Sequence, residues 1–160
     1  MAITETYALI PSAGQAGQIC SLVPATVISR TVETSAGVAF GVVVSQGSAD
    51  HGCVIVASGA TKVLGIVVIN QASKTSGAIE QYGTASILVS GEIWVTVTDS
   101  GGVVAGDDVW LKLSDATFRN DDVGSSGGLK LAGCKYLTSA ANGALAKVRV
   151  DFNVPAVAGA

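Results

Sequence analysis

Apolar and polar residues alternate along much of this chain with the two-residue period of a β-strand that has one buried face. The alternation is clearest in Glu92–Thr98, where one isoleucine and two valines share a face and Trp94 lies on the other. In Leu145–Phe152 the apolar residues alternate in the same way with charged ones. Both segments therefore predict strands that cover a core.

Further short apolar segments follow one another along the chain, separated by clusters of Gly, Ser, Asn and Asp. The predicted strands are Thr26–Glu33, Val38–Val44, Cys53–Ala57, Lys62–Asn70, Ala85–Val89, Glu92–Thr98, Asp108–Leu113, Leu129–Thr138 and Leu145–Phe152. Gly41 and Gly65 lie inside two of them, where a bend or a close backbone approach is expected. Many short strands with regular turns, and no amphipathic helix, predict an all-β fold, a small β-barrel or sandwich.

The first 24 residues lack this pattern, because prolines and glycines interrupt them. We expect residues 1–24 to form an extended N-terminal arm and residues 25–160 a β-barrel domain, with room for a small lobe within 25–84. The arm carries the large apolar residues Tyr7, Leu9, Ile10, Ile19, Leu22 and Val23. They are candidate interface residues, since a solvated tail needs no such side chains; the alternative is a frayed terminus.

Composition adds a reason to expect assembly. Hydrophobic residues make up 49% of the 160 residues and charged residues only 13%, against roughly 25% charged in a typical soluble domain. A free domain needs mixed charge over its surface to stay soluble and monomeric. We therefore expect much of this surface to be covered by a partner.

Charge and cysteine content exclude several classes of partner. The net charge is −3 and the nine Lys and Arg residues are scattered, so we expect no nucleic acid partner. The apolar runs Val38–Val44 and Val63–Ile69 are too short to span a bilayer, so no membrane partner is expected. Three distant cysteines and an N-terminus without the basic start of a secretory signal indicate unpaired thiols and a cytosolic product.

No cluster of residues predicts catalysis. The single histidine, His51, follows Asp50 and precedes Cys53 by two positions, but it lies in a Gly-flanked turn, and an exposed turn histidine is the better interpretation. The cysteine spacing does not match a zinc site, and the Asp107-Asp108 and Asp121-Asp122 pairs are typical of solvated turns. We expect no enzyme activity, no metal and no cofactor.

The two tryptophans are the remaining candidate interface residues. Trp94 and Trp110 are expected on neighbouring strands of a hairpin, opposite the valine-rich face. Tryptophan is enriched among the anchors of protein interfaces. We expect one of them at the core or the barrel end and the other at an interface, and the sequence leaves open which.

Motifs across most of the chain together resemble a known family, the structural cement or capsid decoration proteins of tailed bacteriophages. They are Ala16-Gly17-Gln18-Ile19 with Pro24 and Ile28-Ser29-Arg30, Phe40-Gly41-Val42-Val43-Val44 with Gln46-Gly47, Leu64-Gly65-Ile66-Val67-Val68, and Glu92-Ile93-Trp94-Val95 followed by Val103–Trp110. Each is a loose pattern of small and β-branched residues, and their shared order carries the resemblance.

The resemblance implies a non-enzymatic virion protein, made in the host bacterial cytoplasm, that binds the outer capsid surface. Its partner would be the major capsid protein, and it would stabilise the assembled shell by bridging capsomers. A homo-oligomer is expected, a trimer before a dimer, because capsid lattices offer closed two-fold and three-fold positions. The alternatives are a phage tail or receptor-binding β-structural protein and, behind it, a small hydrolase.

Overall fold

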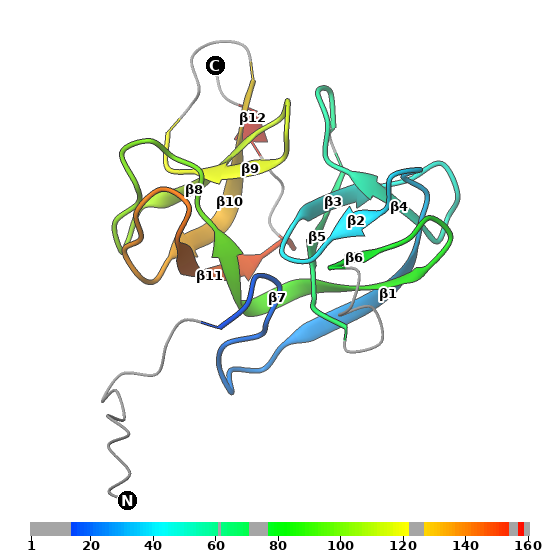
Figure 1. Cartoon of the computed structure of the whole chain (residues 1–160), viewed down its shortest axis with the longest axis horizontal. Coiled ribbons are helices and arrows are strands. Elements are labelled where there is room, and N and C mark those ends of the chain that lie inside the picture. Colours follow the sequence, from blue (N-terminus) through cyan, green and yellow to red (C-terminus); the bar gives the residue numbers. More distant parts are fainter. Residues whose placement is uncertain (1–13, 61, 71–76, 122–126, 154–156, 159–160) are drawn as a thin grey trace, which may run out of the picture.

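The computed structural model of the chain describes residues 14–60, 62–70, 77–121, 127–153 and 157–158. Within these ranges the chain forms strands and turns and no helix, which confirms the predicted all-β class (Figure 1). The strands are β1 (Thr26–Val32), β2 (Val38–Ala39), β3 (Val43–Gln46), β4 (Gly52–Ile55), β5 (Val63–Val67), β6 (Ala78–Ile79), β7 (Thr84–Thr96), β8 (Asp108–Lys112), β9 (Thr117–Arg119), β10 (Gly128–Tyr136), β11 (Leu145–Asp151) and β12 (Val157–Ala158).

Five strands close into a barrel. In the order β1-β4-β3-β5-β7 each strand is hydrogen-bonded to the next, and β7 pairs with β1 to complete the ring. The pairing is antiparallel except between β1 and β4, which run parallel. A small two-stranded sheet, β2 with β6, contributes Val38 and Ile79 to the core of this barrel.

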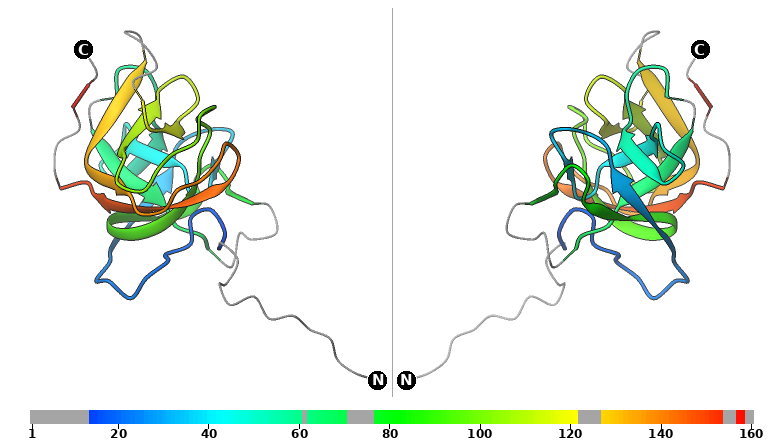
Figure 2. Two further views of the ribbon diagram at one scale, coloured as in Figure 1. Left: turned by 90° about the vertical axis from the view of Figure 1, so that its left-hand side faces the viewer. Right: turned by 90° about the vertical axis from the view of Figure 1, so that its right-hand side faces the viewer.

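A second group of strands grows from the far half of β7. There β7 pairs with β11, and β10, β8 and β9 follow in order. The group curls until β9 returns to the end of β7, where Val97 and Phe118 form a bridge and the Thr98 N–H donates to the Phe118 carbonyl at 3.0 Å. The barrel and this second group therefore share β7, the green strand that runs beneath both in Figure 2.

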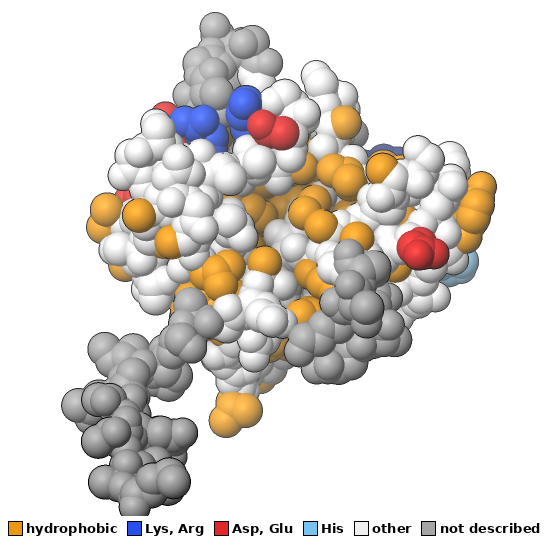
Figure 3. Space-filling model, viewed as in Figure 1, with side chains coloured by type: hydrophobic (Ala, Val, Ile, Leu, Met, Phe, Trp, Pro, Cys, Tyr) orange, Lys and Arg blue, Asp and Glu red, His pale blue; other side chains and the backbone are white. Residues whose placement is uncertain are grey.

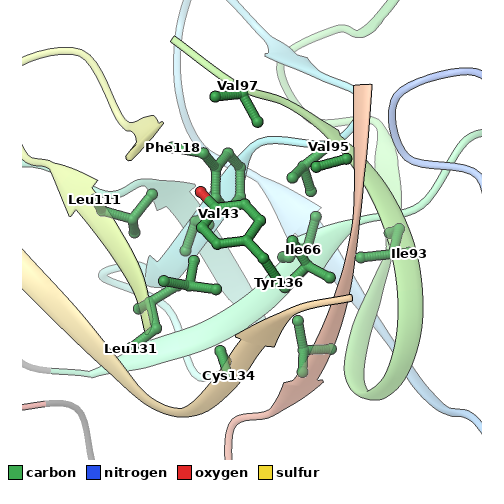
Figure 4. Close-up of a cluster of buried hydrophobic side chains, with 14 of the residues drawn as sticks. Val43, Ile66, Ile93, Val95, Val97, Leu111, Phe118, Leu131, Cys134 and Tyr136 are labelled. Atoms are coloured by element: carbon green, nitrogen blue, oxygen red, sulfur yellow. The ribbon is translucent and has the colours of Figure 1, made fainter. Parts of the chain in front are cut away.

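Strands β3 and β5 and the first half of β7 are buried on both faces. Toward the larger core, shared with the second group, lie Val43, Ile66 and Leu88; toward the barrel interior lie Val44, Val67 and Ile87. Strands covered on both sides read as continuous apolar runs, not as alternation. The larger core also holds Phe118, Leu131 and Tyr136 from the second group (Figure 4).

Several predicted strand limits were wrong. Val38–Val44 is two strands, β2 and β3, because the chain turns at Phe40 and Gly41, where Gly41 has a φ of 75°. Ala85–Val89 and Glu92–Thr98 are one strand, β7, 13 residues long, which continues through Gly91. The strands β6, β9 and β12, of two or three residues each, are too short to show any alternation.

The expected hairpin between the two tryptophans was also wrong. Trp94 lies on β7 and Trp110 on β8, but β11 and β10 lie between these strands in the sheet. The chain segment that joins β7 to β8 is long enough to cross the second group. Sequence neighbours are paired in most sheets, but a curled sheet can insert later strands between them.

Candidate interaction surface

The last part of the predicted arm lies along β7 of its own chain. The Gly17 N–H donates to the Trp94 carbonyl at 2.8 Å, and the Trp94 N–H donates to the Gln18 carbonyl at 3.0 Å. The Cys20 N–H donates to the Glu92 carbonyl at 3.1 Å. Residues 17–20 are thus held to β7 by backbone hydrogen bonds of the kind that join strands.

Two glycines allow this segment to lie directly against the barrel. Gly17 and Gly41 have φ values of 82° and 75°, which favour glycine. A Cβ on Gly41 would lie 2.9 Å from the Gly17 nitrogen, and a Cβ on Gly17 would lie 2.8 Å from the Gly41 nitrogen. The Ile69 N–H also donates to the Gly17 carbonyl at 2.8 Å. Only chains without side chains at both positions can approach so closely.

The apolar residues predicted for the interface fall into three groups. Tyr7, Leu9 and Ile10 lie outside the described residues. Ile19 forms a bridge with Ile93 and packs against the larger core. Leu22 and Val23 are exposed, Leu22 completely. Their role in an interface stays a prediction.

Both tryptophans are half-buried on the outer face of their strands, each beside a lysine. The Lys147 ammonium lies 5.3 Å from the centre of the Trp94 ring, and the Lys130 ammonium 5.9 Å from that of Trp110. A Cβ on Gly14 would lie 2.8 Å from the Trp94 ring, so the N-terminal segment also lies against this indole. Cation–π pairs of this kind stabilise weakly at exposed sites.

Other exposed apolar residues had not been singled out from the sequence. They are Val27, Tyr82, Val104 and Leu137. Tyr82 is 76% exposed and has a φ of 66°, uncommon for a residue other than glycine. Tyr82 stands between Gln81 and Gly83, in the polar segment between two predicted strands, and an aromatic residue at such a place was a usable signal.

Tyr82 borders a hollow of about 490 Å³ between the β3–β4 loop and the turn before β7. Glu33, Ser48, His51 and Gln81 also line it. His51 is exposed, as expected, whereas Cys53 is buried in the barrel core, where burial raises the pKa of its thiol. The hollow therefore joins polar side chains to one aromatic ring but holds no activated thiol.

Several ion pairs lie in and around the second group of strands. Asp108 contacts both Lys130 at 2.7 Å and Lys135 at 2.6 Å, and these hydrogen bonds lower the pKa of its carboxyl. Arg119 lies 3.4 Å from the buried carboxylate of Asp99. Figure 3 shows charged side chains near the top of this half, whereas apolar side chains gather over the middle of the face.

The cysteines are unpaired, as predicted: Cys20 is half-buried, and Cys53 and Cys134 are buried. Among the described residues, no three potential metal ligands lie together. The same part of the chain contains no helix that is long and apolar enough to span a membrane.

Comparisons with known proteins agree with this architecture. A phage chain from "The capsid of Myoviridae Phage XM1" aligns with a TM-score of 0.73 and 22% identity, covering 94% of this chain and 98% of that one. The head fiber gp8.5 N base of bacteriophage phi29 aligns with a TM-score of 0.47 and 10% identity, over 81% of this chain and 96% of that one. The first likeness shows a shared fold.

No curated protein matches the sequence. The sequence profile described as "Structural cement protein (E217 gp24/Pam3 gp6)" matches residues 3–151. This match spans nearly the whole chain, from within the N-terminal arm to the end of β11. The chain belongs to the phage structural cement protein family.

Proposed function

We propose that this protein is a capsid decoration protein, which binds the outer surface of the assembled phage shell and bridges neighbouring capsomers. The observation that carries this proposal is the family match over residues 3–151. The low charge of 13% supports it independently, because a surface so poor in charge suits a covered position. The partner would be the major capsid protein, and the protein would act without catalysis.

The proposed mechanism is stabilisation by binding. A protein that binds only the assembled shell lowers the free energy of that state by RT ln(1 + L/Kd) for each site, where L is the concentration of free protein. Repeated contacts on a symmetric lattice then act together through a high effective concentration. The closed barrel suits a crowded lattice, since its ring leaves no free strand edge that could pair with a neighbouring chain at random.

A cyclic homo-oligomer, a trimer before a dimer, follows from the closed symmetric positions that a capsid lattice offers. The arm residues Tyr7, Leu9, Ile10, Leu22 and Val23 and one of the two tryptophans remain candidates for interface contacts, whereas Ile19 packs on the core. Sedimentation of the purified protein tests the oligomer. A monomer both in solution and after release from shells would contradict it.

Binding to purified shells tests the function. Shells that lack the protein are mixed with it, sedimented and assayed for bound protein, beside unassembled shell subunits at equal concentration. We expect saturable binding to shells and none to subunits, together with greater resistance of the loaded shells to heat. Equal binding to subunits, or no binding to shells, would refute the proposal.

A truncation asks whether the arm contributes. Deletion of residues 2–13 removes none of the contacts described above, whereas deletion through Val23 also removes the segment at residues 17–20 and its hydrogen bonds to β7. We expect the shorter deletion to leave the melting temperature unchanged and to weaken shell binding. Unchanged binding would assign residues 2–13 no part in it.

One observation favours the alternative of a receptor-binding phage protein. Tyr82 is 76% exposed beside a hollow lined by Glu33, His51 and Gln81. An exposed ring beside carboxylate and amide groups is able to hold a sugar. Adsorption of the protein to host cells, compared with a Tyr82→Ala variant, separates this function from shell binding.

A further inference from the structure

The segment before β1 and β1 itself both lie along β7, but four extra residues separate them. Ile19 forms a bridge with Ile93, and Thr26 pairs with Ser90. Between these two pairs β7 contributes Gly91 and Glu92, whereas the facing chain contributes Cys20–Ala25. Extra residues on one strand of a pair form a bulge, which re-aims side chains and is a feature of the fold, not a defect.

These extra residues project into solvent as a finger, which we define as Ser21–Ala25. Leu22 is as exposed as in an extended peptide, and Val23 is 42% exposed. In Figures 1 and 2 the blue loop before β1 extends away from both groups of strands. In the isolated chain the Leu22 side chain therefore buries no apolar surface.

Both ends of the finger are fixed. On one side the Cys20 N–H donates to the Glu92 carbonyl at 3.1 Å, and on the other Thr26 pairs with Ser90. At its base Ala25 lies over Gly91, where a Cβ would come within 3.2 Å of the Ala25 Cβ. Pro24 also restricts the backbone between the two fixed ends at Cys20 and Thr26. A loop held in this way loses little conformational entropy on binding, which favours affinity.

The surroundings of the finger are uncharged in sequence. No charged residue lies between Glu5 and Arg30. The finger thus presents Leu22 and Val23 with no charged side chain of its own, which matches an apolar partner surface.

We propose that the finger inserts Leu22 and Val23 into an apolar recess on the outer surface of the capsid shell protein. This inference rests on the proposed function and names the part of the molecule that faces the shell. A second copy of the chain is a poorer partner, because its hollow beside Glu33 and His51 and that beside Asp50 and Lys62 are lined with charged or polar side chains. A third hollow, beside Phe40 and Ile69, is an apolar site that a second copy could offer, and the oligomer size measured in the test separates that outcome.

The test compares shell binding of the whole protein with that of a Leu22→Ser variant. Removal of one buried leucine side chain should weaken binding at least about tenfold, because full burial of such a side chain corresponds to a factor of that order or more. Since Leu22 has no partner within the described chain, the melting temperature should stay that of the wild type. A Val104→Ser variant is the matched control, because Val104 is also exposed, at 61%, but lies in the connection to β8. It should bind as the wild type does.

Each outcome decides one question. If wild-type protein binds shells and Leu22→Ser binds equally well, the finger does not face the shell and the inference is wrong. If Leu22→Ser lowers the oligomer size and leaves shell binding per protomer unchanged, a second copy receives the finger, which also overturns the proposal. If wild-type protein fails to bind shells at all, the proposed function fails first, and the shell is no longer the partner.

Discussion

The Glu33 carboxylate accepts hydrogen bonds from both the backbone N–H and the hydroxyl of Ser48, at 2.8 Å each. It also accepts one from the Ala49 N–H at 2.9 Å. Gly47 and Gly52 leave room for the same carboxyl group, because a Cβ on either would collide with it. A residue just after β1 therefore holds the whole β3–β4 loop in place.

This arrangement predicts a local dependence on acid. The hydrogen bonds from Ala49 and then Ser48 lower the pKa of Glu33 below its ordinary value. A group with a lowered pKa in the folded state stabilises that state above its unfolded pKa, and the contribution is lost as the pH falls through the folded pKa. In Glu33→Gln we expect faster hydrogen exchange at Ser48 and Ala49 at neutral pH, with a smaller difference from wild type in acid. Glu80→Gln, a change in an exposed turn, is the control; equal effects in both variants would contradict the assignment.

Because Gly17 and Gly41 lie so close together, adding a single methyl group at Gly41 should lower the stability of the fold strongly. Gly41→Ala places a Cβ 2.9 Å from the Gly17 nitrogen and also requires a left-handed backbone, which alone costs roughly 1–2 kcal/mol. Gly59→Ala has the same kind of φ, 83°, but open space around its Cβ, so it isolates the backbone cost. We expect a lower melting temperature for Gly41→Ala than for Gly59→Ala, with earlier proteolysis near residues 14–20. Equal melting temperatures would show that the contact is not tight in solution.

The buried hydroxyl of Tyr136 should make a measurable contribution to the free energy of unfolding. The ring is 1% exposed within the larger core, and its hydroxyl donates to the Arg119 carbonyl at 3.0 Å. Burial also raises the pKa of this phenol, so it stays protonated and able to donate. Tyr136→Phe should lower the free energy of unfolding by about 1 kcal/mol, measured by denaturant titration. Tyr82→Phe, at an exposed ring, should change nothing, and a similar loss there would point to a general effect.

The cysteines should react in the order of their burial. Cys20 is half-buried, whereas burial raises the pKa of the Cys134 thiol to about 11. Because the thiolate is the reactive form, Cys134 should react with a thiol reagent only when the chain unfolds. We expect one faster group in the native protein, lost in Cys20→Ser, and three groups after denaturation. A slow Cys20 in the native protein would mean that an assembly covers it.

Local patterns determined the strands of this protein, because side chains alternate across a strand whatever it pairs with. Ile93 and Val95 on β7, Val97 just after it, and Val148 on β11 are buried as the alternation predicted. The all-β class and the barrel follow from many such segments. Low charge and the order of small-residue motifs pointed to the cement family, which the match over residues 3–151 confirms.

Only the tertiary structure decided which strands meet. Trp94 and Trp110 are separated by two strands that come later in the chain, and no local pattern encodes that insertion. Gly41 was expected inside a strand, but it lies in a turn against which the backbone of Gly17 packs, a contact that no local pattern encodes. Ile19 and Leu22 looked alike in the sequence, yet one packs on the core and the other is exposed. The reason is that alternation depends on neighbours along the chain, whereas closure, register and bulges depend on long-range pairing between Ile19 and Ile93 or between Thr26 and Ser90.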